Sequence, residues 1–239
     1  MARDFDGSTD RIDYASISDL NETFTIAMWV YPETLSGNQY LWHVHPSGDS
    51  SPGCAIWNNT STHLRITLGS GLTMYRQVDN FFTASQWQHL TISCDGTGDE
   101  TGLKIYKNGT EQSYSGGSSG TLIALTGSWS LAGRIYDDSR NFDTRIAEVA
   151  YWNRVLSDAE IAGLGQGFSP LFYPESLLWC PDLIRGTTDK LGNAASTVDG
   201  TTVVEHPPVI YPARPQILIP PVVASATILP QIMQQYYYG

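Results

Sequence analysis

The chain has 239 residues, 22 of them glycine, and a formal net charge of -11. This length suits one large β-sandwich domain, and the many glycines suit short strands joined by tight turns. Only 13 residues are lysine or arginine, so the composition argues against a nucleic acid partner, because phosphate binding depends on clustered cations.

The sequence carries no pattern of a signal peptide or of a membrane span. Met1 is followed within a few residues by a strand-like segment, and no apolar run reaches transmembrane length. We therefore expect a chain that is made in the cytoplasm and has no membrane partner. The three cysteines, Cys54, Cys94 and Cys180, are odd in number and widely spaced, which favours buried or free thiols over a disulfide.

Residues 1–165 alternate short apolar segments with turn clusters, which is typical of a β-sandwich or jelly roll. The first long strand is expected at residues 24–32. Residues 25–31 are so continuously apolar that this strand should be central and covered on both faces. Four clusters rich in small and turn-forming residues are expected to be loops: residues 36–38, 46–49, 95–99 and 115–120.

Residues 145–152 read as a strand rich in β-branched and aromatic side chains, and a capped helical turn follows it. Ser157 and Glu160 have the spacing of a capping box, and Leu156 and Ile161 flank this N-cap as a hydrophobic staple. The helix should be short, because three glycines follow at once: Gly163, Gly165 and Gly167.

The order of these segments resembles that of the concanavalin A-like, laminin-G-type jelly-roll domains. Five segments carry the resemblance: residues 5–12, 24–32, 87–91, 103–109 and 142–161. It covers residues 1–165 and implies an all-β, two-sheet jelly-roll sandwich with one short helix. The chain has Thr144 where the family usually has glycine, and Ala147 where it usually has an acid. These departures weaken the case for an inherited calcium or ligand site beside them.

Residues 166–205 follow the closing segment of this domain and contain a strand-like stretch at residues 177–183. We expect this extension to pack back on the sandwich beside the first strand, which suits termini that lie near each other. A small separate subdomain is the alternative.

Residues 206–239 hold seven of the thirteen prolines, no acidic residue and one strong base, Arg214. Proline fixes φ and removes a donor, so this proline-rich arm is expected to be extended. Its apolar side chains need a partner to bury them, which predicts an assembly arm that docks on its own domain or on a neighbouring subunit. A flexible tail is the alternative. The residues expected to make these contacts are Val209, Ile210, Tyr211, Ile217, Leu218, Ile219, Ile228, Leu229, Tyr236, Tyr237 and Tyr238.

The sequence lacks the constellations typical of enzymes. Glycosidases on this fold use closely spaced carboxylates on one strand, and no such run occurs, with Glu148 alone on its strand. A serine-nucleophile motif, a phosphate-binding glycine loop and a redox cysteine pair are also missing. We therefore expect a protein that is not an enzyme.

Two groups of residues have chemistry suited to metals. His43 and His45 alternate on a probable strand and would share one face, as in some zinc or nickel sites, although ordinary hydrogen-bonding histidines are the favoured interpretation. Two acidic loops have the residue types of calcium sites, although solvated turn acids are the commoner explanation. The acidic candidates are Asp95, Asp99, Asp137 and Asp138. No other cofactor is expected.

Four aromatic residues are candidates for stacking on a carbohydrate: Trp42, Trp57, Tyr75 and Trp129. Tryptophans of a sandwich lie in the core more often than on a binding surface. Both interpretations stay open at this point.

Two functions fit these observations. The first is a structural protein of a virus particle, such as a bacteriophage capsid-decoration or fibre component, located in the virion. Its arm at residues 206–239 would bind other copies of the chain or other virion proteins. The second is a carbohydrate-binding, lectin-like module that recognises cell-surface glycans, with or without calcium. The apolar arm, with no export signal and no catalytic constellation in the sequence, favours the first by analogy.

Overall fold

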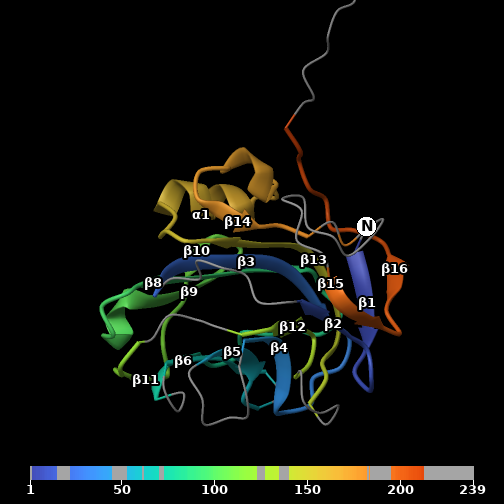
Figure 1. Cartoon of the computed structure of the whole chain (residues 1–239), viewed down its shortest axis with the longest axis horizontal. Coiled ribbons are helices and arrows are strands. Elements are labelled where there is room, and N and C mark those ends of the chain that lie inside the picture. Colours follow the sequence, from blue (N-terminus) through green and yellow to red (C-terminus); the bar gives the residue numbers. More distant parts are fainter. Residues whose placement is uncertain are drawn as a thin grey trace, which may run out of the picture.

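The structure is a computed structural model that describes residues 2–14, 22–44, 53–60, 62–69, 73–122, 127–134, 140–181, 183 and 195–212. Two antiparallel sheets, here called sheet A and sheet B, face each other as a sandwich (Figure 1). The all-β, two-sheet fold expected from the sequence is confirmed. The arm beyond residue 212 lies outside the described residues.

Sheet A holds, in spatial order, β10 (Thr110–Glu111), β9 (Leu103–Lys107), β8 (Gln88–Asp95), β3 (Thr23–Pro32), β13 (Asp143–Trp152), β1 (Ala2–Asp6) and β16 (Thr202–Val204), and β14 (Leu177–Trp179) also pairs with β13. Sheet B holds β11 (Gly116–Ser118), β7 (Met74–Val78), β6 (Leu64–Gly69), β5 (Gly53–Asn58), β4 (Gln39–Val44), β12 (Trp129–Leu131), β2 (Arg11–Tyr14) and β15 (Ala195–Asp199).

Helices are few in the described residues. They are α1 (Asp158–Gly165) and two short 3-10 helices, η2 (Glu100–Gly102) and η3 (Pro170–Phe172). α1 lies over the outer side of sheet A (Figure 1). None of the helices in the described part of the chain is long and apolar enough to span a bilayer.

β3 is a central strand of sheet A, as its apolar sequence predicts. It pairs with β8 on one side and with β13 on the other. Ile26 and Met28 point into the main core between the sheets, whereas Ala27 belongs to a second apolar cluster on the α1 side. Because both faces are covered, the strand has little polar alternation.

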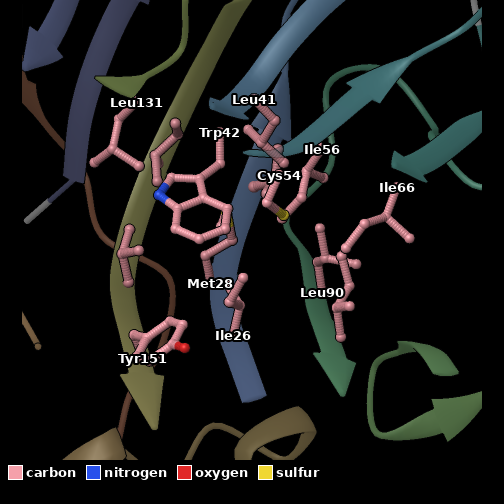
Figure 2. Close-up of a cluster of buried hydrophobic side chains, with 14 of the residues drawn as sticks. Ile26, Met28, Leu41, Trp42, Cys54, Ile56, Ile66, Leu90, Leu131 and Tyr151 are labelled. Carbon is pink, nitrogen blue, oxygen red and sulfur yellow. The ribbon is translucent and has the colours of Figure 1, made fainter. Parts of the chain in front are cut away.

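The main core lies between the two sheets. Figure 2 shows Trp42, Leu41 and Ile56 of sheet B facing Ile26 and Tyr151 of sheet A. All five side chains are buried. Burial of large apolar side chains of this kind makes the largest favourable contribution to the stability of a sandwich.

α1 begins where the sequence predicts. The Ser157 hydroxyl accepts the backbone N–H of Glu160 at 3.4 Å, and the Glu160 carboxylate accepts the backbone N–H of Ser157 at 2.8 Å. Leu156 and Ile161 are both buried in the second apolar cluster. Arg154 adds an ion pair to Glu160 at 2.6 Å, so the turn after β13 is fixed by both polar and apolar contacts.

α1 is short and includes two of the three glycines that follow its first turn. Gly163 and Gly165 lie inside the helix, because their lack of a side chain permits close packing. A Cβ on Gly165 would lie 2.3 Å from the backbone nitrogen of Gly109, and one on Gly163 would lie 2.1 Å from the Tyr173 hydroxyl. The prediction of a short helix is confirmed, because α1 has 8 residues and ends at Gly165.

The segments after α1 supply strands to both sheets. β14 pairs with β13, β15 with β2, and β16 with β1. Trp179 of β14 lies in the main core, with its ring 3.8 Å from that of Trp129 and 4.9 Å from that of Tyr14. The strand expected over residues 177–183 ends earlier, at Trp179, close to Pro181, which has no N–H for a strand ladder.

Residues 116–118 form a strand although their composition predicts a loop. They make up β11, which pairs with β7 at the edge of sheet B. An edge strand needs a partner on one side only, so backbone pairing with β7 is enough to keep even this Gly-Gly-Ser segment extended.

The three cysteines are free thiols and are buried, as their number and spacing predict. Burial raises the pKa of the Cys54 thiol, and it raises the pKa of Cys94 to about 11. Both groups therefore stay protonated near neutral pH.

Candidate ligand-binding face

Alternation along β5, β6 and β7 divides their side chains between the core and the outer face of sheet B. Ile56, Ile66 and Met74 point into the core. Their neighbours on the opposite face include Trp57 and Arg65, which lie directly across from each other. The outer face of sheet B therefore combines aromatic and basic side chains on adjacent strands.

An aromatic–arginine row, made of Tyr40, Trp57, Arg65 and Tyr75, crosses four strands of this face. The rings of Tyr40 and Trp57 are stacked, 5.7 Å apart with an interplanar angle of 11°. The guanidinium carbon of Arg65 lies 6.0 Å from the centre of the Trp57 ring and 3.8 Å from that of Tyr75. Arg65 thus lies between two aromatic rings, which restricts the orientation of its guanidinium plane.

Three hydrogen-bond donors along this row are shielded from solvent and have no partner among the described residues: Trp57 Nε1, Arg65 Nε and Thr67 Oγ1. Thr67 is 4% exposed and pairs across from Tyr75. A buried polar group without a hydrogen bond is destabilising by roughly 1–3 kcal/mol, and such groups are rare in native proteins. Three of them lie on this one face, beside the partly exposed rings of Trp57 and Tyr75.

Positive charge also gathers at the Tyr40 end of the row. The guanidinium groups of Arg134 and Arg140 lie 5.4 Å and 5.8 Å from the Tyr40 ring centre, and Arg140 donates a hydrogen bond to the Tyr40 hydroxyl at 3.3 Å. The His43 ring packs edge-on against Tyr40 at 5.2 Å. The face is therefore locally basic on a chain whose formal net charge is -11.

Two of the four aromatic residues proposed for sugar stacking are in the core instead. Trp42 and Trp129 are each 1% exposed, and their rings pack against each other at 5.5 Å. In β4 a register shift between Tyr40 and Trp42 places Leu41 and Trp42 both in the core, as Figure 2 shows. These two tryptophans have no surface for a ligand, so their assignment was wrong. Trp57 and Tyr75 are partly exposed and stay candidates.

The proposed metal ligands do not form a site in the part of the chain that the structure describes. Asp95 accepts hydrogen bonds from the N–H and hydroxyl of Thr97, and Asp99 accepts the same pair from Thr101. Both carboxylates therefore act in their own turns, as Asx residues do. No group of three or more metal-binding side chains occurs among the described residues. The other candidates, His45, Asp137 and Asp138, lie outside them.

A second polar cluster, centred on Glu148, lies on the side of sheet A that carries α1. Glu148 has φ +49, and it sits where the register of β13 against β3 shifts between Ala147 and Ala150. Such a bulge turns a side chain out of the normal alternation of the strand. It directs the carboxylate to residues that follow α1 in the sequence.

Three side chains converge on this carboxylate. Ser169 donates to Glu148 Oε2 at 3.1 Å, Tyr211 donates to Oε1 at 2.6 Å, and His206 Nε2 lies 3.2 Å from Oε1. His206 Nδ1 lies 2.6 Å from the carbonyl oxygen of Pro207. Both ring nitrogens of His206 therefore lie within hydrogen-bond distance of an oxygen atom. Glu148 thus has three side-chain partners, which come from two later segments of the chain, Ser169 and residues 206–211.

The first residues of the proline-rich arm are thus bound to the sandwich. Ile210 exchanges two backbone hydrogen bonds with the segment after α1, to Gly167 and Ser169, each 2.8 Å long. Ile210 and Tyr211 are 52% and 42% exposed, and Val209 is partly exposed. The other residues named for assembly contacts are Ile217, Leu218, Ile219, Ile228, Leu229, Tyr236, Tyr237 and Tyr238, and they lie outside the described residues.

The sequence of the sandwich matches a known protein family. The model of the concanavalin A-like lectin/glucanases superfamily matches residues 6–162. The chain belongs to this superfamily. No curated protein is similar enough in sequence to count as a relative.

Solved structures share the superfamily fold at low sequence identity. A Bacteroides ovatus ATCC 8483 protein assigned to carbohydrate binding has a TM-score of 0.58 at 18% identity, over 82% of this chain and 59% of that protein. A heptameric SAP-like pentraxin from Limulus polyphemus has a TM-score of 0.55 at 12% identity, over 84% and 93% of the two chains. Domain 4 of AbnA, an extracellular arabinanase from Geobacillus stearothermophilus, in complex with arabinotriose, has a TM-score of 0.54 at 19% identity, over 69% and 76%.

The concanavalin A-like match ends inside α1. The three later strands and the Glu148 partners Ser169, His206 and Tyr211 therefore lie beyond the matched residues. The sequence alone could not predict the aromatic–arginine row or the Glu148 cluster in full. Each forms only when segments that are distant in the sequence come together. The one available signal was Glu148 itself, a glutamate among the apolar residues 146–152 of β13.

Proposed function

We propose that this chain is a non-enzymatic carbohydrate-binding module whose ligand lies on the outer face of sheet B. The observation that carries the proposal is the set of unpartnered donors of Trp57, Arg65 and Thr67 beside partly exposed aromatic rings. Sugars are bound by this combination, since aromatic rings contact their C–H faces and polar groups bind their oxygen atoms.

Two further points support this proposal. The fold is shared with the arabinotriose complex of AbnA domain 4 and with the Bacteroides protein assigned to carbohydrate binding. Among the described strand residues, this face has two carboxylates, Asp13, which is ion-paired with Arg11 at 3.0 Å, and Asp199, which lies directly across from Arg11. Neither is on a strand of the aromatic–arginine row. Glycoside hydrolysis generally needs two carboxylates across the bond that is cleaved, so a binding role fits this row better than a hydrolytic one.

The test is a glycan array followed by calorimetric titration of the glycans that bind. Trp57→Ala should weaken binding roughly tenfold, through the loss of ring contacts and of the indole donor. Trp87→Ala is the matched control, since Trp87 is also partly exposed but packs on Tyr31 of β3, at 5.5 Å. Equal affinities for wild type and Trp57→Ala, or no glycan bound by the folded protein, would contradict the proposal.

A second proposal concerns where the module works. We propose that the chain is a surface component of a virus particle, made in the host cytoplasm, and that residues 206–239 attach it to other copies or to other virion proteins. The observation that favours this role is the anchoring of His206 and Tyr211 on Glu148, which fixes the start of the apolar arm. Cell-surface glycans would then be the targets of the outer face of sheet B.

Removal of residues 213–239 tests the role of the arm while keeping the Glu148 contacts intact. The shortened chain should keep its thermal stability and its glycan binding, and lose higher-order assembly, measured by light scattering of the purified protein and by incorporation into particles. If the shortened chain keeps the mass of the full chain and still enters particles, the assembly role of the arm is wrong.

A further inference from the structure

Arg65 differs from the other arginines that pack on aromatic rings. Arg145 lies 4.8 Å from the Tyr31 ring centre, but its guanidinium also binds the carboxylate of Glu33. Arg76 lies 3.9 Å from the Tyr114 ring centre, and its Nε donates to the carbonyl oxygen of Leu103. In the described part of the chain Arg65 has ring contacts alone, with no ion pair and no hydrogen bond.

The missing partner of Arg65 is informative because acidic groups are abundant. The chain has 24 aspartate and glutamate residues against 13 lysine and arginine residues, and carboxylates pair with Arg11, Arg145 and Arg154. The guanidinium carbon of Arg65 instead lies 3.8 Å from the centre of the Tyr75 ring, and its shielded Nε–H lacks an acceptor among the described residues. A guanidinium in this state presents a fixed fork of donors, which matches the two oxygens of a carboxylate.

The groups next to Arg65 also favour an acceptor. Trp57 Nε1 can only donate, and the Thr67 hydroxyl has a free proton to donate. Arg140 adds a cation beside Tyr40, and no carboxylate pairs with it among the described residues. A neutral sugar hydroxyl both donates and accepts, whereas a carboxylate only accepts. A face of donors with unpaired positive charge therefore matches the carboxylate better.

We infer that the ligand of the outer face of sheet B is a saccharide with a carboxylate group, a uronic acid or another sugar acid, and that Arg65 binds this carboxylate. The inference rests on the proposed function, because it names the class of sugar that the same face would bind. The aromatic rings beside Arg65 distinguish such a ligand from a small inorganic anion, because they provide contact area for the sugar ring.

The experiment uses the full chain and matched pairs of glycans. An array of uronate-containing, sialylated, sulfated and neutral glycans is followed by calorimetric titration with an acidic glycan that binds and with its carboxyl-reduced counterpart. Wild type should prefer the carboxylate form by tenfold or more, since hydrogen bonds to charged groups are the stronger ones. Added salt should weaken this preference.

Two variants of Arg65 complete the test. Arg65→Gln should reduce affinity for the acidic glycan tenfold or more and leave affinity for the reduced glycan nearly unchanged. Arg65→Lys should give an intermediate loss, because it keeps the charge but loses the fork. Arg145→Gln is the control for removal of an arginine that packs on an aromatic ring, and circular dichroism checks that each variant is folded.

The outcomes separate this inference from the proposed function. Binding of neutral glycans that Trp57→Ala weakens and Arg65→Gln leaves unchanged would overturn the inference and leave the proposed function standing. Binding of sulfated glycans in preference to carboxylated ones would overturn the carboxylate assignment. No binding of any glycan by folded wild type would overturn both.

Discussion

Thr67 has a buried hydroxyl that makes no hydrogen bond within the described part of the chain. Replacing it with valine keeps the shape of the side chain and removes a buried polar atom. Thr67→Val should therefore raise the free energy of unfolding by up to about 1 kcal/mol, or leave it unchanged. The same change should weaken glycan binding.

Urea denaturation and calorimetric titration of one Thr67→Val preparation measure both effects. A residue that serves binding rather than stability is expected to behave in this way, with binding weakened and stability unchanged or raised when it is replaced. A clear loss of stability would mean that the hydroxyl has a partner inside the protein, and would argue against a role in binding.

His89 is a buried histidine that should make the fold sensitive to acid. Burial lowers its pKa from 6.5 to about 3, although the charge of Glu148 acts in the opposite direction. The unfolded chain takes up a proton below pH 6.5 and the folded chain does not, so stability falls as the pH drops from 6.5 towards 3. The slope from this one group approaches about 1.4 kcal/mol per pH unit.

His89→Gln removes the titrating group, so it should flatten this acid dependence even if it lowers stability at pH 7. Urea unfolding at pH 7, 6 and 5 measures the slope for both proteins. Parallel slopes for wild type and variant would show that His89 does not stay neutral in the folded state.

At the scale of elements, the start of α1 should also respond to pH. Hydrogen bonds from Arg154, and further ones from Ser157, lower the pKa of Glu160 from 4.5 to about 2. A carboxylate with a lowered pKa stabilises the fold above pH 4.5, and this contribution is lost as the pH falls towards 2. Glu160→Gln should cost roughly 1 kcal/mol at pH 7 and progressively less below pH 4.5.

Thermal unfolding between pH 7 and pH 2.5 follows the effect of Glu160→Gln. Glu111→Gln is the control, because Glu111 makes a more exposed ion pair, with Lys104 at 3.4 Å. If the two variants lose stability equally at every pH, the hydrogen bonds of Glu160 at the start of α1 contribute no more than an exposed ion pair, and the prediction is wrong.

The segment that starts the arm should depend on the Glu148 cluster. His206→Ala removes the contact with Glu148 Oε1, so the N–H groups of Ile210 and Ser169 should exchange with solvent faster, while those of β3 stay protected. His63→Ala is the matched control, since His63 also pairs with a carboxylate, Asp79, at 3.1 Å. Unchanged exchange at Ile210 in His206→Ala would show that the backbone pairing alone holds this segment.

The elements differ in how far the sequence could predict them. Apolar runs and the capping box located β3, β13 and the start of α1, because these signals are local. The location of Trp42 in the core could not be predicted, because it follows from a register shift in β4. The neighbours of Arg65 could not be predicted either, because they depend on the pairing of three strands.

At the scale of the whole molecule, the two polar regions lie on opposite sides of the sandwich. The aromatic–arginine row is on the outer face of sheet B, and the Glu148 cluster is on the side of sheet A that carries α1. Figure 1 shows the described end of the chain leaving from this second side. Attachment through the arm would therefore leave the outer face of sheet B available to a ligand, so the two proposed roles are compatible.

The most direct test of the central claim follows the indole N–H signals of the seven tryptophans by NMR during titration with a glycan that binds. We expect the Trp57 Nε1–H signal to shift most, together with Arg65 Nε–H and the Thr67 amide. The signals of the core residues Trp42 and Trp129 should move little. Shifts confined to Trp87 or to the segment around His206, with Trp57 unchanged, would contradict a binding site on the outer face of sheet B.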